Sequence, residues 1–140
     1  MRILFGFALL ILGGLGASQA EASVFARIDL SSQRMFVSVN GVPTYSWAVS
    51  TARRGYRTPI GNFRPIRMHR RYYSRRYAGA AMPHSVFFYG GYAIHGTDKI
   101  SQLGRPASHG CVRLHPSHAA TLFNLINRHG RANSRIQVRW

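Results

Sequence analysis

Two short stretches decide how this chain is interpreted: Ala93-Ile94-His95-Gly96-Thr97 and Ser108-His109-Gly110-Cys111-Val112-Arg113-Leu114. The second contains Cys111, the only cysteine among 140 residues, which therefore has no internal disulfide partner. Histidine and glycine stand in both stretches, and Arg113 follows the cysteine by two positions. This composition is expected around a nucleophilic cysteine, because a thiol is activated by an imidazole or another positive influence within hydrogen-bond reach.

Cys111 is the predicted nucleophile and His95 the predicted base. Directly opposed residues on paired strands have Cβ atoms about 4.5 to 5.5 Å apart, whereas residues two apart on one strand are separated by roughly 6.5 to 7 Å. We therefore expect His95 to meet Cys111 across paired strands and His109 to brace the cysteine loop. Gly110 permits a sharp turn, so the amides of Gly110 and Cys111 are predicted to face the oxyanion of an acyl-transfer intermediate. Ser108 is expected to orient the loop by hydrogen bonding.

Two further residues of these stretches are candidate substrate-binding residues, Arg113 and Gly96. On an extended stretch Arg113 would project to the same face as Cys111, which suits the binding of a substrate carboxylate. A structural ion pair is an equally good interpretation of Arg113, and the Asp98 carboxylate is one candidate for orienting the His95 ring. The sequence lacks a second cysteine and a Cys/His pair at zinc-ligand spacing, so we expect neither a metal nor another cofactor.

The N-terminal residues resemble a secretory signal peptide. Arg2 precedes an apolar run from Ile3 to Leu12, and a Gly/Ala/Ser-rich stretch then ends at Ala20-Glu21-Ala22. The apolar run is shorter than the roughly 20 residues needed to span a bilayer. We expect residues 1–22 to be a cleaved leader, residues 23–140 to form one domain, and the protein to reside in the periplasm or outside the cell, associated with the cell wall.

The net charge of +16 predicts a polyanionic partner. The densest cationic run extends from Arg53 to Arg76, has tyrosines interleaved, and contains no acidic residue. Arginine with tyrosine is also typical of nucleic-acid binding, but export favours anionic cell-wall polymers, and no nucleic acid is expected. The alternative is a solvated, mobile loop whose charge serves solubility.

The pattern of apolar residues predicts a mainly β fold. Residues 24–39 alternate as two short strands, Asn40-Gly41 is a two-residue hairpin signal, and a third strand is expected over residues 44–50. These three strands should form an antiparallel meander. Pro59 and Gly61 bracket a predicted bend before Phe63, and the arginine- and tyrosine-rich segment that continues to Gly79 has no clean period and is expected to be irregular.

The second half of the chain predicts a further hairpin, one helix and a last strand. Gly90-Gly91 separates strands at 86–89 and 92–94, and the second of these delivers His95 at its end. Pro116 is acceptable in a first helical turn, and apolar residues recur at helical spacing until Gly130. One principal helix near the C-terminus is therefore expected, followed by a strand at residues 136–140 that returns to the sheet.

The segments Ile94-His95-Gly96-Thr97 and Ser108 to Leu114 resemble the signature of YkuD-type L,D-transpeptidases. The resemblance continues upstream through Arg57-Thr58-Pro59-Ile60-Gly61-Asn62-Phe63 and from Met82 to Phe88, and so covers residues 24 to 140. It implies a single-domain β-sandwich or barrel-like fold and a backbone carbonyl, in place of Asp98, as the group that orients the His95 ring.

The resemblance also implies a reaction. In this family the cysteine attacks a peptidoglycan stem peptide at an L-to-D bond, and a thioester acyl-enzyme results. An amine of a neighbouring stem then gives a 3-to-3 cross-link in cell-wall biogenesis, a lipoprotein lysine gives protein anchoring, and water gives L,D-carboxypeptidase activity. The sequence leaves the acceptor open. The competing interpretation is a non-catalytic, arginine-rich module that binds the cell wall or another polyanion.

Overall fold

The computed structural model describes residues 22–140. Residues 1–21, which make up almost all of the predicted leader, lie outside this range. Within residues 22–140 no helix combines the length and apolar character needed to cross a membrane. In chain order the elements are β1 (Val24–Asp29), β2 (Arg34–Val39), β3 (Val42–Ala48), β4 (Gly61–Phe63), β5 (Arg67–His69), β6 (Ser85–Tyr89), β7 (Tyr92–Gly96), the 3-10 helix η1 (Ile100–Gln102), β8 (Val112–Leu114), α1 (Pro116–His129), the 3-10 helix η2 (Arg131–Asn133) and β9 (Ser134–Arg139).

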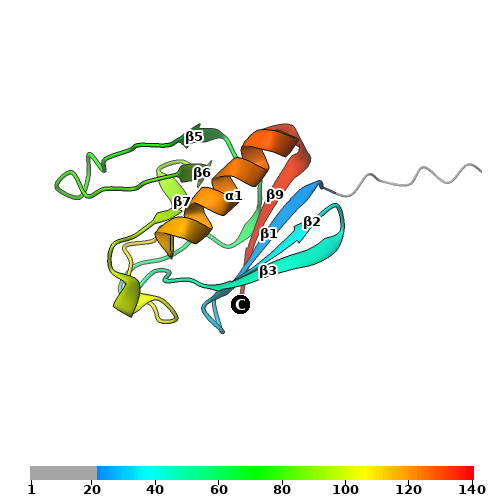
Figure 1. The fold of residues 1–140 in the computed structure, drawn as a ribbon. Coiled ribbons are helices and arrows are strands. Elements are labelled where there is room, and N and C mark those ends of the chain that lie inside the picture. The colour runs from blue at the N-terminus through cyan, green and yellow to red at the C-terminus, as the bar shows by residue number, and fades with distance from the viewer. Residues whose placement is uncertain (1–21) are drawn as a thin grey trace, which may run out of the picture.

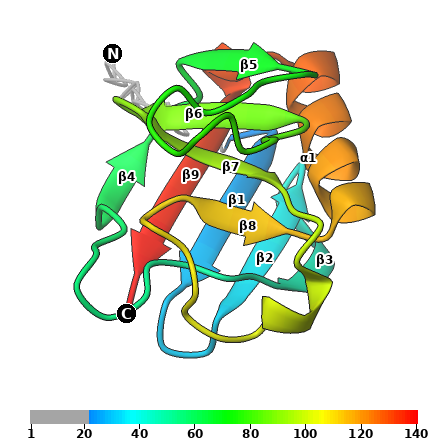
Figure 2. The same cartoon turned by 90° about the vertical axis from the view of Figure 1, so that its left-hand side faces the viewer.

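The strands form two sheets. One has five strands in the order β3-β2-β1-β9-β4, and the other has four in the order β5-β6-β7-β8. The strands of the second sheet run across those of the first, and α1 lies along one side of the pair (Figures 1 and 2). The predicted fold class, mainly β with one principal helix near the C-terminus, is confirmed.

The predicted meander forms the larger part of the first sheet. β1 and β2 pair antiparallel, and so do β2 and β3. Asn40 and Gly41 have φ values of 50° and 76°, the backbone conformation that a two-residue hairpin turn requires. The last strand, β9, returns to this sheet as predicted, and it pairs parallel with β1.

The prediction of a bend before Phe63 and of an irregular segment from there to Gly79 is wrong in part. β4 pairs antiparallel with β9, and β5 pairs antiparallel with β6. Each of these strands has three residues, which is too short for an alternating pattern to be recognised. The rest of the segment is irregular, apart from an isolated bridge between Tyr73 and Ala81.

The helix α1 has the predicted limits and packs its apolar face against the core between the sheets. Its buried residues are Ala119, Leu122, Phe123 and Ile126, the four positions that gave the helical spacing. The helix begins two residues after β8 and contacts β7 more than any other strand. Because β7 ends at the His95-Gly96 pair, α1 supports the strand that presents the predicted base.

Candidate active site

Strands β7 and β8 bring the two sequence motifs together. They pair parallel, with Ile94 opposite Val112 and His95 opposite Arg113. Cys111 comes directly before β8, so it stands diagonal to His95, and the expectation of a directly opposed pair is wrong. The site is nonetheless formed by adjacent strands of one sheet, as the sequence predicted.

The Cys111 side chain is half-buried and packs against the apolar cluster of Met82, Phe87 and Ala93. Burial raises the pKa of the thiol above its ordinary value, because the low-dielectric surroundings disfavour the thiolate. The backbone of Ala93 and the Arg113 cation act in the opposite direction and lower this pKa, but they do not overcome burial. At neutral pH the Cys111 side chain is therefore the neutral thiol.

The His95 ring is also buried, with 7% of its surface exposed. Its Nδ1 lies 2.7 Å from the carbonyl oxygen of Gly96. Since a carbonyl can only accept a hydrogen bond, Nδ1 carries the proton, and Nε2 is left with the lone pair that a base needs. A backbone carbonyl thus orients the ring, as the resemblance implied, and Asp98 is exposed and takes no part in this contact.

The pKa of His95 is lowered to about 4, mainly by burial and to a smaller extent by the Arg113 cation, while the hydrogen bond to Gly96 acts in the opposite direction. The ring is consequently neutral at pH 7. A neutral imidazole can accept a proton, which is what a general base requires, so His95 keeps the protonation state needed for its predicted role.

Gly96 is buried and supports His95. Its N–H donates to the carbonyl of Pro83, 2.9 Å away, and its own carbonyl accepts from His95. A Cβ at this position would lie 3.2 Å from Pro116 Cα and 3.2 Å from Pro83 Cγ. Gly96 therefore has a structural role in supporting His95, and its predicted substrate-binding role stays a prediction.

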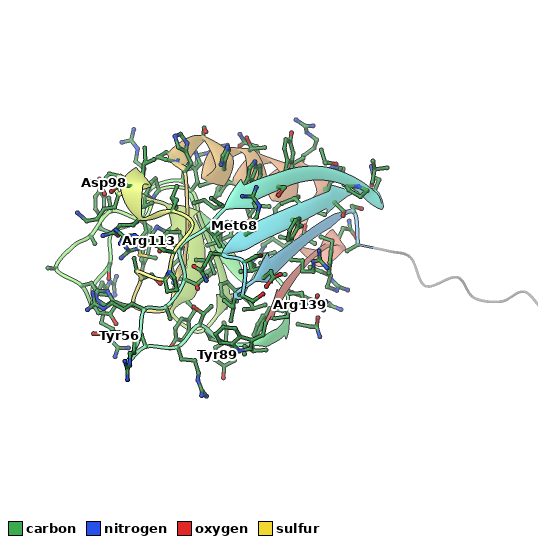
Figure 3. All side chains as sticks on the ribbon, turned by 90° about the horizontal axis from the view of Figure 1, so that it is seen from below. Tyr56, Met68, Tyr89, Asp98, Arg113 and Arg139 are labelled. Carbon is green, nitrogen blue, oxygen red and sulfur yellow. The ribbon has the colours of Figure 1, made fainter. Side chains whose placement is uncertain are left out.

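Arg113 supplies the positive charge of the site. Its Nη1 donates to Gln102 Oε1 at 3.1 Å and to the Ala107 carbonyl at 3.5 Å, both of them neutral oxygens. Burial lowers the pKa of Arg113 below its ordinary value, the Arg53 cation also lowers it, and the ionisable Cys111 and Asp98 side chains oppose this shift. Figure 3 shows Arg113 and Asp98 at the same end of the molecule. The cation is held by neutral partners, so it can still attract an anionic group.

The loop before Cys111 is fixed by Ser108, as the sequence led us to expect. Ser108 Oγ accepts from the Gly110 N–H at 3.0 Å and donates to the Cys111 carbonyl at 2.6 Å. The Ser108 backbone also bonds with residues 51–53, because its N–H donates to Thr51 and its carbonyl accepts from Arg53.

Gly110 adopts a backbone conformation that side chains rarely permit, with φ of +135°. A Cβ there would lie 2.5 Å from Tyr92 Cε1 and 2.9 Å from the Arg57 carbonyl oxygen. The prediction that the Gly110 amide faces an oxyanion is not met, because that N–H donates to Ser108. Of the two predicted donors, the Cys111 amide remains.

His109 braces the loop through aromatic contacts. Its ring stacks on Tyr77 at a centroid distance of 4.2 Å and meets the edge of Tyr56 at 4.8 Å. Burial lowers the pKa of His109, and the cations of Arg53 and Arg113 lower it further. The ring thereby connects the cysteine loop to the arginine- and tyrosine-rich segment, which is consistent with the bracing role predicted for it.

Thr58 is a residue to which the sequence analysis gave no role. Its buried hydroxyl donates to the Gly110 carbonyl at 2.9 Å and accepts from the Ala52 N–H at 3.0 Å. Thr58 stands within the upstream motif that resembles the family, and this was the available signal. Its partner Gly110 is too distant in sequence for any local pattern to connect the two.

A cavity of about 670 Å³ lies next to Thr58 and does not reach Cys111. Tyr56, Thr58, Tyr89 and Trp140 are among its lining residues, and neither Cys111 nor His95 is. Across residues 22–140 there is no cluster of three His, Cys, Asp or Glu side chains able to hold a metal ion. The candidate site is therefore identified from the side chains of Cys111, His95 and Arg113, and not from a cavity or a metal cluster.

Comparisons with known proteins agree on one family. The family model described as YkuD, the L,D-transpeptidase catalytic domain, matches residues 23–136. An L,D-transpeptidase from Stackebrandtia nassauensis is similar in structure, with 25% identity and a TM-score of 0.74 over 88% of this chain and 58% of that chain. One from Mycobacterium smegmatis has 22% identity and a TM-score of 0.74 over 85% of this chain and 59% of that chain.

A third similar structure is L,D-transpeptidase 3 from Mycobacterium tuberculosis in complex with a faropenem-derived adduct. It has 18% identity and a TM-score of 0.73, over 84% of this chain and 60% of that chain. The present chain thus spans about three fifths of the length of these solved structures. No curated protein matches it in sequence.

We expect Gly110→Ala to disrupt the site. Backbone strain at φ +135° and the overlap with Tyr92 should together lower the free energy of unfolding by about 2–4 kcal/mol. Urea unfolding measures this change. Gly91→Ala is the matched control, because nothing lies within 4 Å of its Cβ position, and its effect should be small. Equal effects of the two substitutions would contradict the role given to Gly110.

The buried His95 should make stability fall in mild acid. Its pKa is about 4 in the folded protein and about 6.5 when unfolded. Between pH 6.5 and pH 4 the imidazole is therefore protonated in the unfolded state but still neutral in the native state, which favours unfolding. This contribution is complete above pH 6.5 and declines by up to about 3 kcal/mol as the pH falls to 4. Urea unfolding at several pH values should show a shallower decline for His95→Asn, and equal slopes would refute the assignment.

Proposed function

The chain belongs to the YkuD L,D-transpeptidase catalytic domain family, and we propose that it is an exported cysteine acyltransferase acting on peptidoglycan stem peptides through a thioester on Cys111. The observation that carries the proposal is the state of His95, whose Nδ1–H is committed to the Gly96 carbonyl while Nε2 is available. Membership of a family of catalytic domains, and the presence of Cys111 and His95 on adjacent strands, favour an enzyme over a non-catalytic binding module.

The proposed first step is acylation of Cys111. Neutral His95 accepts the thiol proton as the sulfur attacks the carbonyl carbon of the L-to-D amide bond, and negative charge develops on the carbonyl oxygen. The Cys111 amide N–H supports that oxygen. The C–N bond then breaks, the leaving D-residue amine takes the proton from His95, and a thioester remains on Cys111.

The second step releases the acyl group to an acceptor. An amine of a neighbouring stem peptide attacks the thioester, loses a proton to His95, and forms a 3-to-3 cross-link, while the sulfur recovers a proton from His95. A lipoprotein lysine in the same position would give attachment of a protein to the wall, and water would give L,D-carboxypeptidase activity. Arg113 is proposed to hold a substrate carboxylate, because its guanidinium has neutral partners only among the hydrogen bonds described.

The proposed location is the periplasm or the cell wall outside the cell. The match to the family model begins at residue 23, directly after the expected leader at residues 1–22. In this proposal residues 23–140 are the catalytic domain, and the enzyme meets its polymeric substrate after export.

Anionic cell-wall polymers are the proposed partners of the arginine- and tyrosine-rich segment. Several of its cations lie over aromatic rings, with Arg67 3.8 Å from the Phe87 centroid and Arg76 5.6 Å from that of Tyr77. Tyr77 in turn stacks on His109. The segment therefore holds positive charge beside the cysteine loop, where attraction of an anionic polymer would raise the local substrate concentration.

A carbapenem tests the acyl-enzyme. A solved relative is described in complex with a faropenem-derived adduct, and we expect intact-mass measurement to detect a covalent adduct on this protein after incubation with imipenem. Cys111→Ala should abolish both the adduct and turnover of isolated sacculi while leaving the fold intact. Turnover retained in Cys111→Ala would contradict the acyl-enzyme mechanism. With the wild-type protein, the muropeptides released from digested sacculi would identify the acceptor.

Neutralising arginines of the cationic segment should weaken binding to sacculi. We expect the triple substitution Arg54→Gln, Arg71→Gln and Arg75→Gln to reduce binding severalfold at low salt, with an effect that fades as salt screens the charges. The control removes the same charge elsewhere, through Arg128→Gln, Arg135→Gln and Arg139→Gln. Co-sedimentation measures both, and an equal loss in the control would show that net charge alone governs binding.

A further inference from the structure

Thr58 is a buried hydroxyl placed between two segments that are far apart in sequence. With 3% of its surface exposed, it donates to the Gly110 carbonyl at 2.9 Å and accepts from the Ala52 N–H at 3.0 Å. The following Pro59 favours extended backbone conformations at Thr58. Both hydrogen-bonding capacities of the hydroxyl are thus used to hold the cysteine loop.

The bond to Gly110 fixes the direction of another group. The peptide unit between Gly110 and Cys111 is trans, since no cis peptide bond occurs among the residues described. In a trans peptide the C=O and the N–H lie in one plane and point in opposite directions. Because Thr58 holds the Gly110 carbonyl, it also sets the direction of the Cys111 N–H, which must point away from Thr58.

Hydrogen bonds account for the other polar backbone groups of this pair. Ser108 Oγ accepts from the Gly110 N–H and donates to the Cys111 carbonyl, and the Thr58 hydroxyl donates to the Gly110 carbonyl. Within residues 22–140 the Cys111 N–H is the one group of the four without an acceptor. Backbone donors inside a folded protein are almost always paired, so a donor left open beside the nucleophile is available to a ligand.

We propose that Thr58 is a positioning residue that aims the Cys111 N–H at the oxyanion formed when Cys111 is acylated. An acyl group attached to the sulfur brings its oxygen near the amide of the same residue, which is the arrangement of oxyanion holes that use the nucleophile's own N–H. The inference rests on the proposed acyl transfer and adds the residue that aligns its oxyanion donor.

Two reactions of the same thiol separate this role from a general structural one. Alkylation by iodoacetamide displaces iodide and develops no oxyanion. Acylation by p-nitrophenyl acetate forms a tetrahedral oxyanion, after which the acetyl thioester forms, p-nitrophenolate leaves, and the thiol proton passes through His95 to solvent. A residue that only stabilises the loop should change both rates, whereas an oxyanion-positioning residue should change the second.

We expect Thr58→Val to slow acylation by about tenfold to a hundredfold, which is less than the roughly 10²–10³-fold loss seen when an oxyanion donor is removed, and to change alkylation by less than about twofold. Thr58→Ser retains the hydroxyl and should restore most of the acylation rate. Ser134→Ala is the control, because it removes another buried hydroxyl that donates to a glycine carbonyl, that of Gly130 at 2.8 Å. It should alter neither rate.

Equal slowing of both reactions by Thr58→Val, or an unchanged acylation rate, would overturn the proposal. If Thr58→Val does not fold, Thr58→Ala makes the same comparison, and failure of both to fold would assign the hydroxyl to the fold and end the proposal. Because p-nitrophenyl acetate has no feature of a stem peptide, a protein that it acylates but imipenem does not would contradict the proposed substrate class and leave the role of Thr58 standing.

Discussion

Backbone hydrogen bonds on both sides of residues 108–114 are the constraint on which the site depends. On one side β8 pairs with β7, which carries His95. On the other side Ser50 exchanges two hydrogen bonds with Arg113, and residues 51 and 53 bond to Ser108. The cysteine loop is therefore an interior segment whose position is set by two neighbours, and an interior segment moves less than an exposed loop. The buried Gln33 extends the support, because its side chain bonds to both the N–H and the hydroxyl of Thr51.

The sequence predicted the parts of this structure that depend on local patterns. Alternation gave the meander, Asn40-Gly41 gave its turn, and helical spacing gave α1. The strands β4 and β5 were missed because three residues carry no period. Thr58 and Gln33 were missed for a different reason, because the role of a buried polar residue depends on its hydrogen-bond partners. The partner of Thr58, Gly110, lies 52 positions away, and the partner of Gln33, Thr51, lies 18 positions away. The register that sets Arg113, and not Cys111, opposite His95 is likewise a tertiary property.

The charge distribution has an energetic consequence for the fold. Residues 22–140 contain two carboxylate side chains, Asp29 and Asp98, against eighteen of the chain's 19 Lys and Arg residues, all but Arg2. Repulsion among these cations opposes compaction, and so few carboxylates cannot neutralise them. Aromatic faces supply part of the compensation, as where Arg70 lies 5.2 Å from the Phe123 centroid. An anionic polymer bound over these cations would relieve the repulsion, so binding and stability would rise together.

Arg113 lowers the pKa of both groups of the proposed Cys–His pair, with opposite consequences for proton transfer between them. Its charge lowers the pKa of Cys111, which favours the thiolate, and it lowers the pKa of His95, which disfavours the imidazolium. When a proton passes from sulfur to imidazole, the influence of Arg113 on Cys111 favours the transfer and its influence on His95 opposes it. Burial disfavours both charged forms, so both groups are neutral at rest. A neutral thiol oxidises more slowly than a thiolate, which suits a lone cysteine in the exported enzyme proposed above. In the proposed mechanism the thiol becomes strongly nucleophilic only as His95 accepts its proton, and the negative charge that develops is carried by the carbonyl oxygen next to the Cys111 N–H.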